Sequence, residues 1–136
     1  MTNKLPTKTI TMENIEEIYE YIFAPYVKQL KLSFLEIEEG RVVAKLENSR
    51  DYQFVTGAVS GQVLMSVIDT TMSIAMNTSI KSQRGTLSQN NNFIRPAFGD
   101  YFIIESIVQR FGRSIAIGET KVYSEDNKEK IICHAT

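Results

Sequence analysis

The sequence predicts an α+β fold in which an antiparallel β-sheet curves around one long helix. Three observations support this prediction. Residues 15–23 carry apolar side chains at helical spacing, and residues 61–76 form a longer, mostly apolar and proline-free run. The remaining stretches alternate apolar and polar residues between short turn segments, as β-strands do. The predicted order is helix, two strands, helix, four strands, and a mostly apolar helix needs a sheet curved around it to be buried.

Length and composition are those of one globular domain, residues 1–136, with 43% apolar and 23% charged residues. A formal net charge of -1 provides no basic field, so nucleic acid and membrane surfaces are not expected partners. The start of the chain lacks the apolar core of a secretory signal, and the long uncharged run is too polar for a membrane span. We therefore expect a soluble, cytoplasmic protein. The single Cys133 and single His134 leave too few ligands for a zinc site, so no metal is expected.

The first elements are a helix and a hairpin. A helix is predicted from Thr11, a residue that commonly precedes the first turn, to the position before Pro25. Alternating residues then predict two antiparallel strands, 31–37 and 41–46, joined by a tight turn at Gly40.

An uncharged loop, residues 52–60, precedes the central helix, which begins at Gly61. Proline, glycine and charged turn residues then separate the extended stretches that follow this helix. These stretches are residues 86–95, 100–111, 113–124 and a last one from 130.

Asp69 is the first functional candidate, because it is the only charged residue between Asp51 and Lys81. A buried, ionised and unpaired carboxylate would cost several kcal/mol, so this group must be solvated, neutralised or used. On a helical wheel it belongs to one polar stripe, formed by Gln62, Ser66, Asp69, Ser73 and Asn77. Solvent-facing stripes usually carry Lys, Glu or Arg, so this one indicates a face covered by a ligand or a partner chain. Plain exposure of an amphipathic helix is the alternative.

The start of the central helix offers a second functional group. Its unpaired backbone N–H groups and the positive end of the helix dipole can hold an anion or a developing oxyanion. Gly61 and Asp69 are eight residues apart, about 12 Å along the helix, which is too far for both to act on one carbon atom. Antiparallel pairing of two central helices would bring Gly61 of one subunit to Asp69 of another, so the spacing predicts a homodimer.

Two segments carry a resemblance to a known family: Gly57 to Thr71, GAVSGQVLMSVIDTT, and Thr86 to Pro96, TLSQNNNFIRP. The chain resembles the hotdog-fold thioesterases of the phenylacetate-pathway (PaaI-like) family over nearly its whole length. The resemblance implies an antiparallel sheet wrapped around a central helix, here with an extra N-terminal helix, and a homodimer or dimer-of-dimers homotetramer. It also implies hydrolysis of acyl-CoA thioesters to free acid and CoA, with no cofactor beyond the coenzyme A of the substrate.

The resemblance assigns roles by matching position. Asp69 would be the general base or nucleophile, and the backbone N–H of Gly61 would be the oxyanion donor. Thr86, expected to begin the strand after the helix, would help to place water. The substrate-binding candidates are Ser60, Gln62, Phe54, Asn92, Arg95 and Arg113. Arg113 is the first choice for the coenzyme A phosphates, although exposed arginines at turns are often only solvated charges.

The chain departs from the family pattern at the start of the central helix. The family usually has His-Gly-Gly there, whereas this chain has Ser60-Gly61-Gln62. The missing imidazole leaves a second hypothesis open, a non-catalytic hotdog module that binds an acyl-thioester or lipid-like ligand. An enoyl-thioester hydratase and a serine triad are disfavoured, because His134 has no evident pairing with the helix or with Ser60. The family's last strand usually runs beyond the position of Thr136, which indicates either a short natural end or an incomplete chain.

Overall fold

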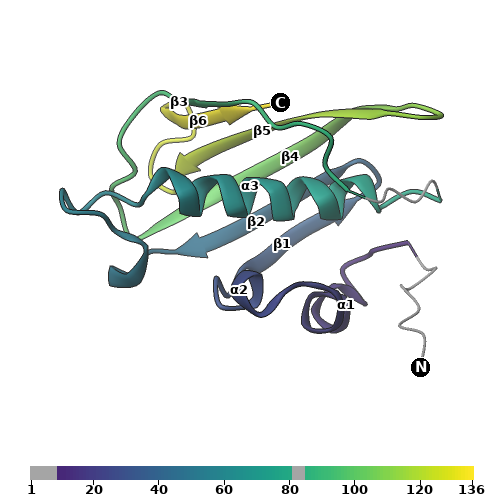
Figure 1. Ribbon diagram of the computed structural model, residues 1–136, viewed down its shortest axis with the longest axis horizontal. Helices are drawn as coiled ribbons and strands as arrows, with labels where there is room; N and C mark the ends of the chain where they lie inside the picture. Colours follow the sequence, from purple (N-terminus) through teal and green to yellow (C-terminus); the bar gives the residue numbers. More distant parts are fainter. Residues whose placement is uncertain (1–8, 81–84) are drawn as a thin grey trace.

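The computed structural model describes residues 9–80 and 85–136 (Figure 1). Its described residues form a six-stranded sheet of order β1-β2-β4-β5-β6-β3, in which all neighbouring strands are antiparallel. The elements are α1 (Ile15–Ile22), α2 (Pro25–Lys28), β1 (Ser33–Glu38), β2 (Arg41–Glu47), η1 (Arg50–Tyr52), α3 (Gly61–Met76), β3 (Asn91–Phe93), β4 (Tyr101–Phe111), β5 (Ala116–Ser124) and β6 (Ile131–Ala135). Figure 1 shows α3 lying across the sheet, with α1 and α2 on the side of β1. The predicted α+β hotdog fold with its extra N-terminal helix is confirmed.

The core lies between α3 and the sheet. The apolar face predicted for the central helix is buried, and it packs with inward-facing side chains of the strands such as Leu46, Phe102 and Ile104. The opposite face of the sheet is charged, and Arg41 on β2 pairs there with Glu105 on β4 at 2.9 Å. This contrast follows from the alternation of side chains along a strand.

The first helix begins later than predicted. The turn at residues 12–14 precedes it, and α1 starts at Ile15 rather than just after Thr11. Residues 11–14 form a turn, in which the N–H of Asn14 donates to the carbonyl of Thr11 at 3.3 Å and Asn14 Oδ1 accepts from the N–H of Thr11 at 2.8 Å. The short helix α2 was not predicted, because Pro25 was interpreted as a stop signal although proline is also favoured at the first position of a helix.

The strand predicted at 86–95 is mostly wrong. Within this range β3 covers only Asn91–Phe93, which pairs with β6, and backbone bonds of Asn90 to Thr136 and of Ile94 and Arg95 to Ile132 extend the pairing. Thr86 therefore lies five residues before β3 and does not begin it. The preceding residues instead run along α3 and bond to it through their side chains. The strand predicted from Arg113 begins at Ala116, because residues 112–115 form the turn after β4.

Both ends of α3 are attached to the rest of the fold. Before its start, the N–H of Ser60 donates to the carbonyl of Tyr52 at 2.8 Å. Beyond its end, Thr78 Oγ1 accepts from the N–H of Gly40 in the β1–β2 turn at 2.7 Å. These bonds fix which side of the helix faces away from the sheet. None of the helices found in residues 9–80 and 85–136 has the length and apolar character needed to cross a lipid bilayer.

Candidate active site

Asp69 lies in the middle of α3, on the side that the sheet does not cover, and its side chain is exposed. Its Oδ1 atom accepts a hydrogen bond of 2.6 Å from Thr86 Oγ1. Three residues further along, Gln89 Nε2 donates to the carbonyl of Met65, one turn before Asp69. The 85–90 segment therefore runs antiparallel to α3 and holds a hydroxyl group against the carboxylate. This hydrogen bond fixes the position of one carboxylate oxygen of Asp69.

The Asp69–Thr86 pair forms part of the wall of a cavity of about 790 Å³. This cavity lies between the C-terminal half of α3, helix α1, the 85–90 segment and the start of β5. Its volume is in the range of cavities that enclose small organic ligands. A carboxylate at the wall of such a cavity can reach a bound molecule without being buried in the core.

The start of α3 is shaped by Ser60 and Phe93. Ser60 has extended backbone angles, and its Oγ accepts from the N–H of Val63 at 3.3 Å, so it is the N-cap of the helix. A Cβ atom placed on Gly61 would lie 3.3 Å from two ring atoms of Phe93 on β3. Glycine at this position thus lets an aromatic ring approach the helix tip, where the first backbone N–H groups have no partner within the helix.

Ser60→Ala should lower the free energy of unfolding by about 1 kcal/mol, because the cap of α3 is lost. Ser60→Asn is the matched control, since its side chain also caps helices and should largely retain stability. Chemical denaturation of the three proteins at one concentration measures the difference. Equal stability of the alanine and asparagine variants would contradict the capping role.

The other predicted site residues lie apart from the Asp69–Thr86 pair within this chain. Phe54 is half exposed in the loop before α3, and Gln62 is exposed in the first turn of the helix. Arg95 Nη1 donates to the carbonyl of Ile131 at 2.7 Å. Arg113 is exposed in the β4–β5 turn, next to two residues that line the cavity. Of the residues predicted to form the site, only Asp69 and Thr86 line that cavity.

Asn92 points away from the central helix. It pairs with His134 on β6, and residues directly opposite each other in a sheet lie on the same face. His134 alternates with the core residues Cys133 and Ala135, so both His134 and Asn92 lie on the face away from α3. The neighbours of Asn92 face the helix instead: Asn91 Oδ1 accepts from Gln89 Nε2 at 2.8 Å, and Phe93 covers Gly61.

His134 and Cys133 have structural partners. His134 Nε2 lies 2.9 Å from Glu119 Oε2, and this hydrogen bond holds the pKa of the Glu119 carboxyl below its usual value. A triad of Ser60 and His134 is therefore not formed, since the imidazole lies on the far face of the sheet. Cys133 is fully buried in the core, as predicted, and burial raises the pKa of its thiol to about 11.

Sequence reasoning missed Gln89 as a residue of the site. Gln89 joins α3 to β3 through its bonds to Met65 and Asn91. Met72 lines the cavity one turn beyond Asp69. The only available signal for Gln89 was a polar residue within a stretch interpreted as a strand.

The fold is that of the hotdog thioesterases, and comparison with known proteins supports thioester hydrolysis as the reaction class. The model of the Thioesterase superfamily matches residues 56–131, more than half of the chain. The chain therefore belongs to the Thioesterase superfamily, and thioester hydrolysis is the reaction class that this membership supports. The Saccharolobus solfataricus protein SSO2140, whose name assigns it provisionally as an esterase, is 27% identical over 115 residues, which are 84% of this chain and 81% of that protein.

Solved structures confirm the PaaI-like hotdog fold. The PaaI protein of E. coli superposes with a TM-score of 0.79 at 18% identity, covering 90% of this chain and 86% of its own. The Haemophilus influenzae thioesterase HI1161 superposes with a TM-score of 0.79 at 21% identity, covering 97% of this chain and 90% of its own. At these identities the similarity establishes the fold.

Proposed function

We propose that this protein is an acyl-CoA thioesterase whose active site combines Asp69 of one protomer with the Gly61 N–H of a second. The observation that carries this proposal is the Asp69 carboxylate, bonded to Thr86 at 2.6 Å in the wall of a ligand-sized cavity. A thioester placed there would have a base or nucleophile within reach. Arg113, exposed beside the cavity wall, would meet the coenzyme A phosphates.

The proposed reaction has two possible first steps at Asp69. As a general base, the carboxylate takes a proton from water while the water oxygen attacks the thioester carbonyl carbon. As a nucleophile, a carboxylate oxygen attacks that carbon, and loss of the thiolate from the resulting tetrahedral intermediate leaves a mixed anhydride, which water then hydrolyses. In both cases the carbonyl oxygen becomes an oxyanion that accepts a hydrogen bond from an N–H at the tip of α3. The C–S bond then breaks, and the thiolate of coenzyme A leaves and takes up a proton.

The proposed mechanism needs a second copy of the chain, because Gly61 and Asp69 are eight residues apart on one helix, about 12 Å along its axis. Exposed apolar side chains around the N-terminal tip of α3 support such an interface; they are Phe54, Val55, Phe93, Ile94 and Phe98. Apolar surface of this kind commonly marks a contact with another protein chain. Strand β3 is also an edge of the sheet, and an edge strand presents unpaired backbone N–H and C=O groups on its outer side.

A non-catalytic module that binds an acyl-thioester or lipid-like ligand is the second candidate. The observation that favours it is the Phe93 ring beside Gly61, which covers part of the helix tip where an oxyanion would bind. Thioester binding without thiol release, across aliphatic and aromatic acyl-CoA substrates, would favour this candidate.

A complementation experiment tests the composite site. Gly61→Pro removes the N–H, and proline is tolerated at the first helical position after an extended residue such as Ser60. Gly61→Ala is the matched control, because it brings a Cβ against Phe93 but keeps the N–H. We expect Gly61→Pro to lose about 100-fold to 1,000-fold in kcat, as for loss of an oxyanion donor, and Gly61→Ala to lose much less.

Mixed dimers then distinguish an active site shared between two protomers from an active site formed within one protomer. Protomers carrying Gly61→Pro and Asp69→Asn, co-expressed with different affinity tags and purified through both, should regain about half of the wild-type activity, since one of two sites is intact. Activity no higher than that of the single variants would show that the site does not combine groups from two protomers.

A further inference from the structure

Beyond the Asp69–Thr86 pair, the cavity wall combines polar side chains with apolar ones, and the apolar ones are mostly aliphatic. Its wall continues from Asp69 to Ile22 on α1, Leu87 in the 85–90 segment, and Ile115 and Ile117 at the start of β5. These four side chains are 37% to 81% exposed, so they are available to a ligand. Among the apolar lining residues within 9–80 and 85–136, only Phe23 is aromatic. Such a wall provides apolar contact area without the stacked rings that would favour a flat aromatic group.

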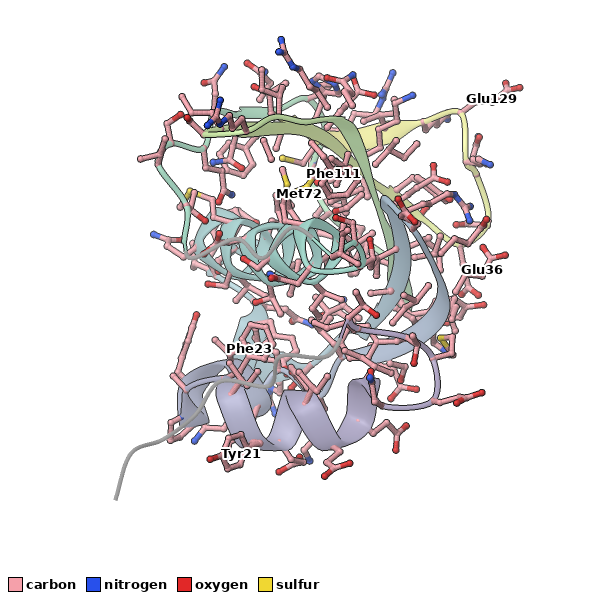
Figure 2. All side chains as sticks on the ribbon, turned by 90° about the vertical axis from the view of Figure 1, so that its right-hand side faces the viewer. Tyr21, Phe23, Glu36, Met72, Phe111 and Glu129 are labelled. Carbon is pink, nitrogen blue, oxygen red and sulfur yellow. The ribbon has the colours of Figure 1, made fainter. Side chains whose placement is uncertain are left out.

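Met72 enters this cavity from α3, and Gly118 on β5 determines where its side chain lies. A Cβ atom placed on Gly118 would overlap the Sδ and Cε atoms of Met72. Figure 2 shows Met72 pointing from α3 toward the sheet, while Phe23 points from α1 toward α3. Gly118 is a buried residue inside a nine-residue strand, where glycine is unfavourable unless another group approaches closely. The close approach here is the thioether of Met72.

We infer that the acyl group of the substrate is an aliphatic chain that extends from Asp69 along this wall, and that Met72, seated against Gly118, determines the chain length accepted. This inference rests on the proposed thioesterase function. While Met72 occupies the space over Gly118, the remaining cavity is free for the chain. A side chain at position 118 would push the flexible thioether into that free space and shorten the chain that fits.

Two variants with opposite effects test the inference. The ratio of kcat/KM for dodecanoyl-CoA to that for butyryl-CoA is measured for each. Met72→Ala should raise this ratio about tenfold, and Gly118→Ala should lower it about tenfold, as expected when a pocket gains or loses room for a few methylenes. The double variant should recover the ratio toward the Met72→Ala value, because the overlap is gone. Met65→Ala is the matched control on the same helix, outside the cavity wall, and should leave the ratio unchanged.

Gly118→Ala also brings its Cβ within 3.2 Å of the carbonyl oxygen of Ile107, so this variant alone can lose stability. Met72→Ala carries the test on its own in that case. An unchanged ratio in Met72→Ala, or a wild-type preference for phenylacetyl-CoA over aliphatic chains of equal size, would overturn the inference.

A binding measurement separates this inference from the proposed function. In the Asp69→Asn background, calorimetry with dodecanoyl-CoA and butyryl-CoA reports chain-length preference without hydrolysis. A preference that shifts with Met72→Ala, together with no thiol release by the parent protein in which Asp69 is intact, would support the chain-length role and reject the hydrolytic function. Equal affinity for both chains and for free coenzyme A, in a protein that does hydrolyse thioesters, would reject the chain-length role alone.

Discussion

Asp69→Asn is expected to lower the rate of acyl-CoA hydrolysis by on the order of a hundredfold or more, because a neutral amide neither accepts the proton nor attacks the carbonyl. The amide oxygen can still accept the hydrogen bond from Thr86, so the 85–90 segment should keep its place. The loss should appear in kcat with a small change in KM. Thiol release measured with a chromogenic reagent follows the reaction, and the buried Cys133 should contribute little signal because its thiol pKa is about 11.

The control for this variant is Asp51→Asn, which removes an exposed carboxylate in η1. It should hydrolyse the same substrates at close to the wild-type rate. A hydrolysis rate of Asp69→Asn within a few-fold of the wild type would exclude Asp69 as base or nucleophile.

Phe102→Ala should lower the free energy of unfolding by about 3–5 kcal/mol, since a large aromatic side chain is lost from a closely packed core. Phe102 on β4 has no exposed surface, and it belongs to the cluster that packs α3 against the sheet. Urea denaturation of the variant and the parent at equal protein concentration gives the difference, because dimerisation would make stability depend on concentration.

Tyr21→Ala is the aromatic control for Phe102→Ala. Tyr21 on α1 is 59% exposed, and Figure 2 shows it pointing away from the rest of the molecule. A surface substitution of this kind should change the free energy of unfolding by about 0.5 kcal/mol or less. If both variants lost the same stability, the packing of Phe102 would not be the cause.

The helical part of the fold could be predicted because its signals are local. In the sixteen residues from Gly61, apolar side chains recur at helical spacing throughout. The boundaries and the buried face of α3 therefore follow from the sequence. Asp69 could be identified from a local signal too, because it carries the only carboxylate on that helix. The role of Thr86 did not come from a local signal. It was proposed from a family resemblance, on the wrong assumption that Thr86 begins a strand.

The 85–90 segment could not be predicted, because its structure depends on partners distant in the sequence. Residues from Thr86 to Phe93 are compatible with a strand, but Thr86 and Gln89 bond to α3, and strand β3 begins only at Asn91. The direction of Asn92 was equally inaccessible, since it depends on the register between β3 and β6. A run of three asparagines gives no apolar alternation from which to choose that register.

The short pairing between β3 and β6 has a consequence for the tip of α3. Three residue pairs, extended by the mutual backbone bonds of Asn90 and Thr136 at 2.9 and 3.0 Å, decide which side chain meets Gly61. Sliding β3 by a single residue would turn Phe93 to the charged face and present an asparagine amide to the helix start. The asparagine amide would then compete for hydrogen bonds with the first backbone N–H groups of α3, which the Phe93 ring otherwise covers. The last residues of the chain thereby control the chemistry of a helix tip more than seventy positions earlier.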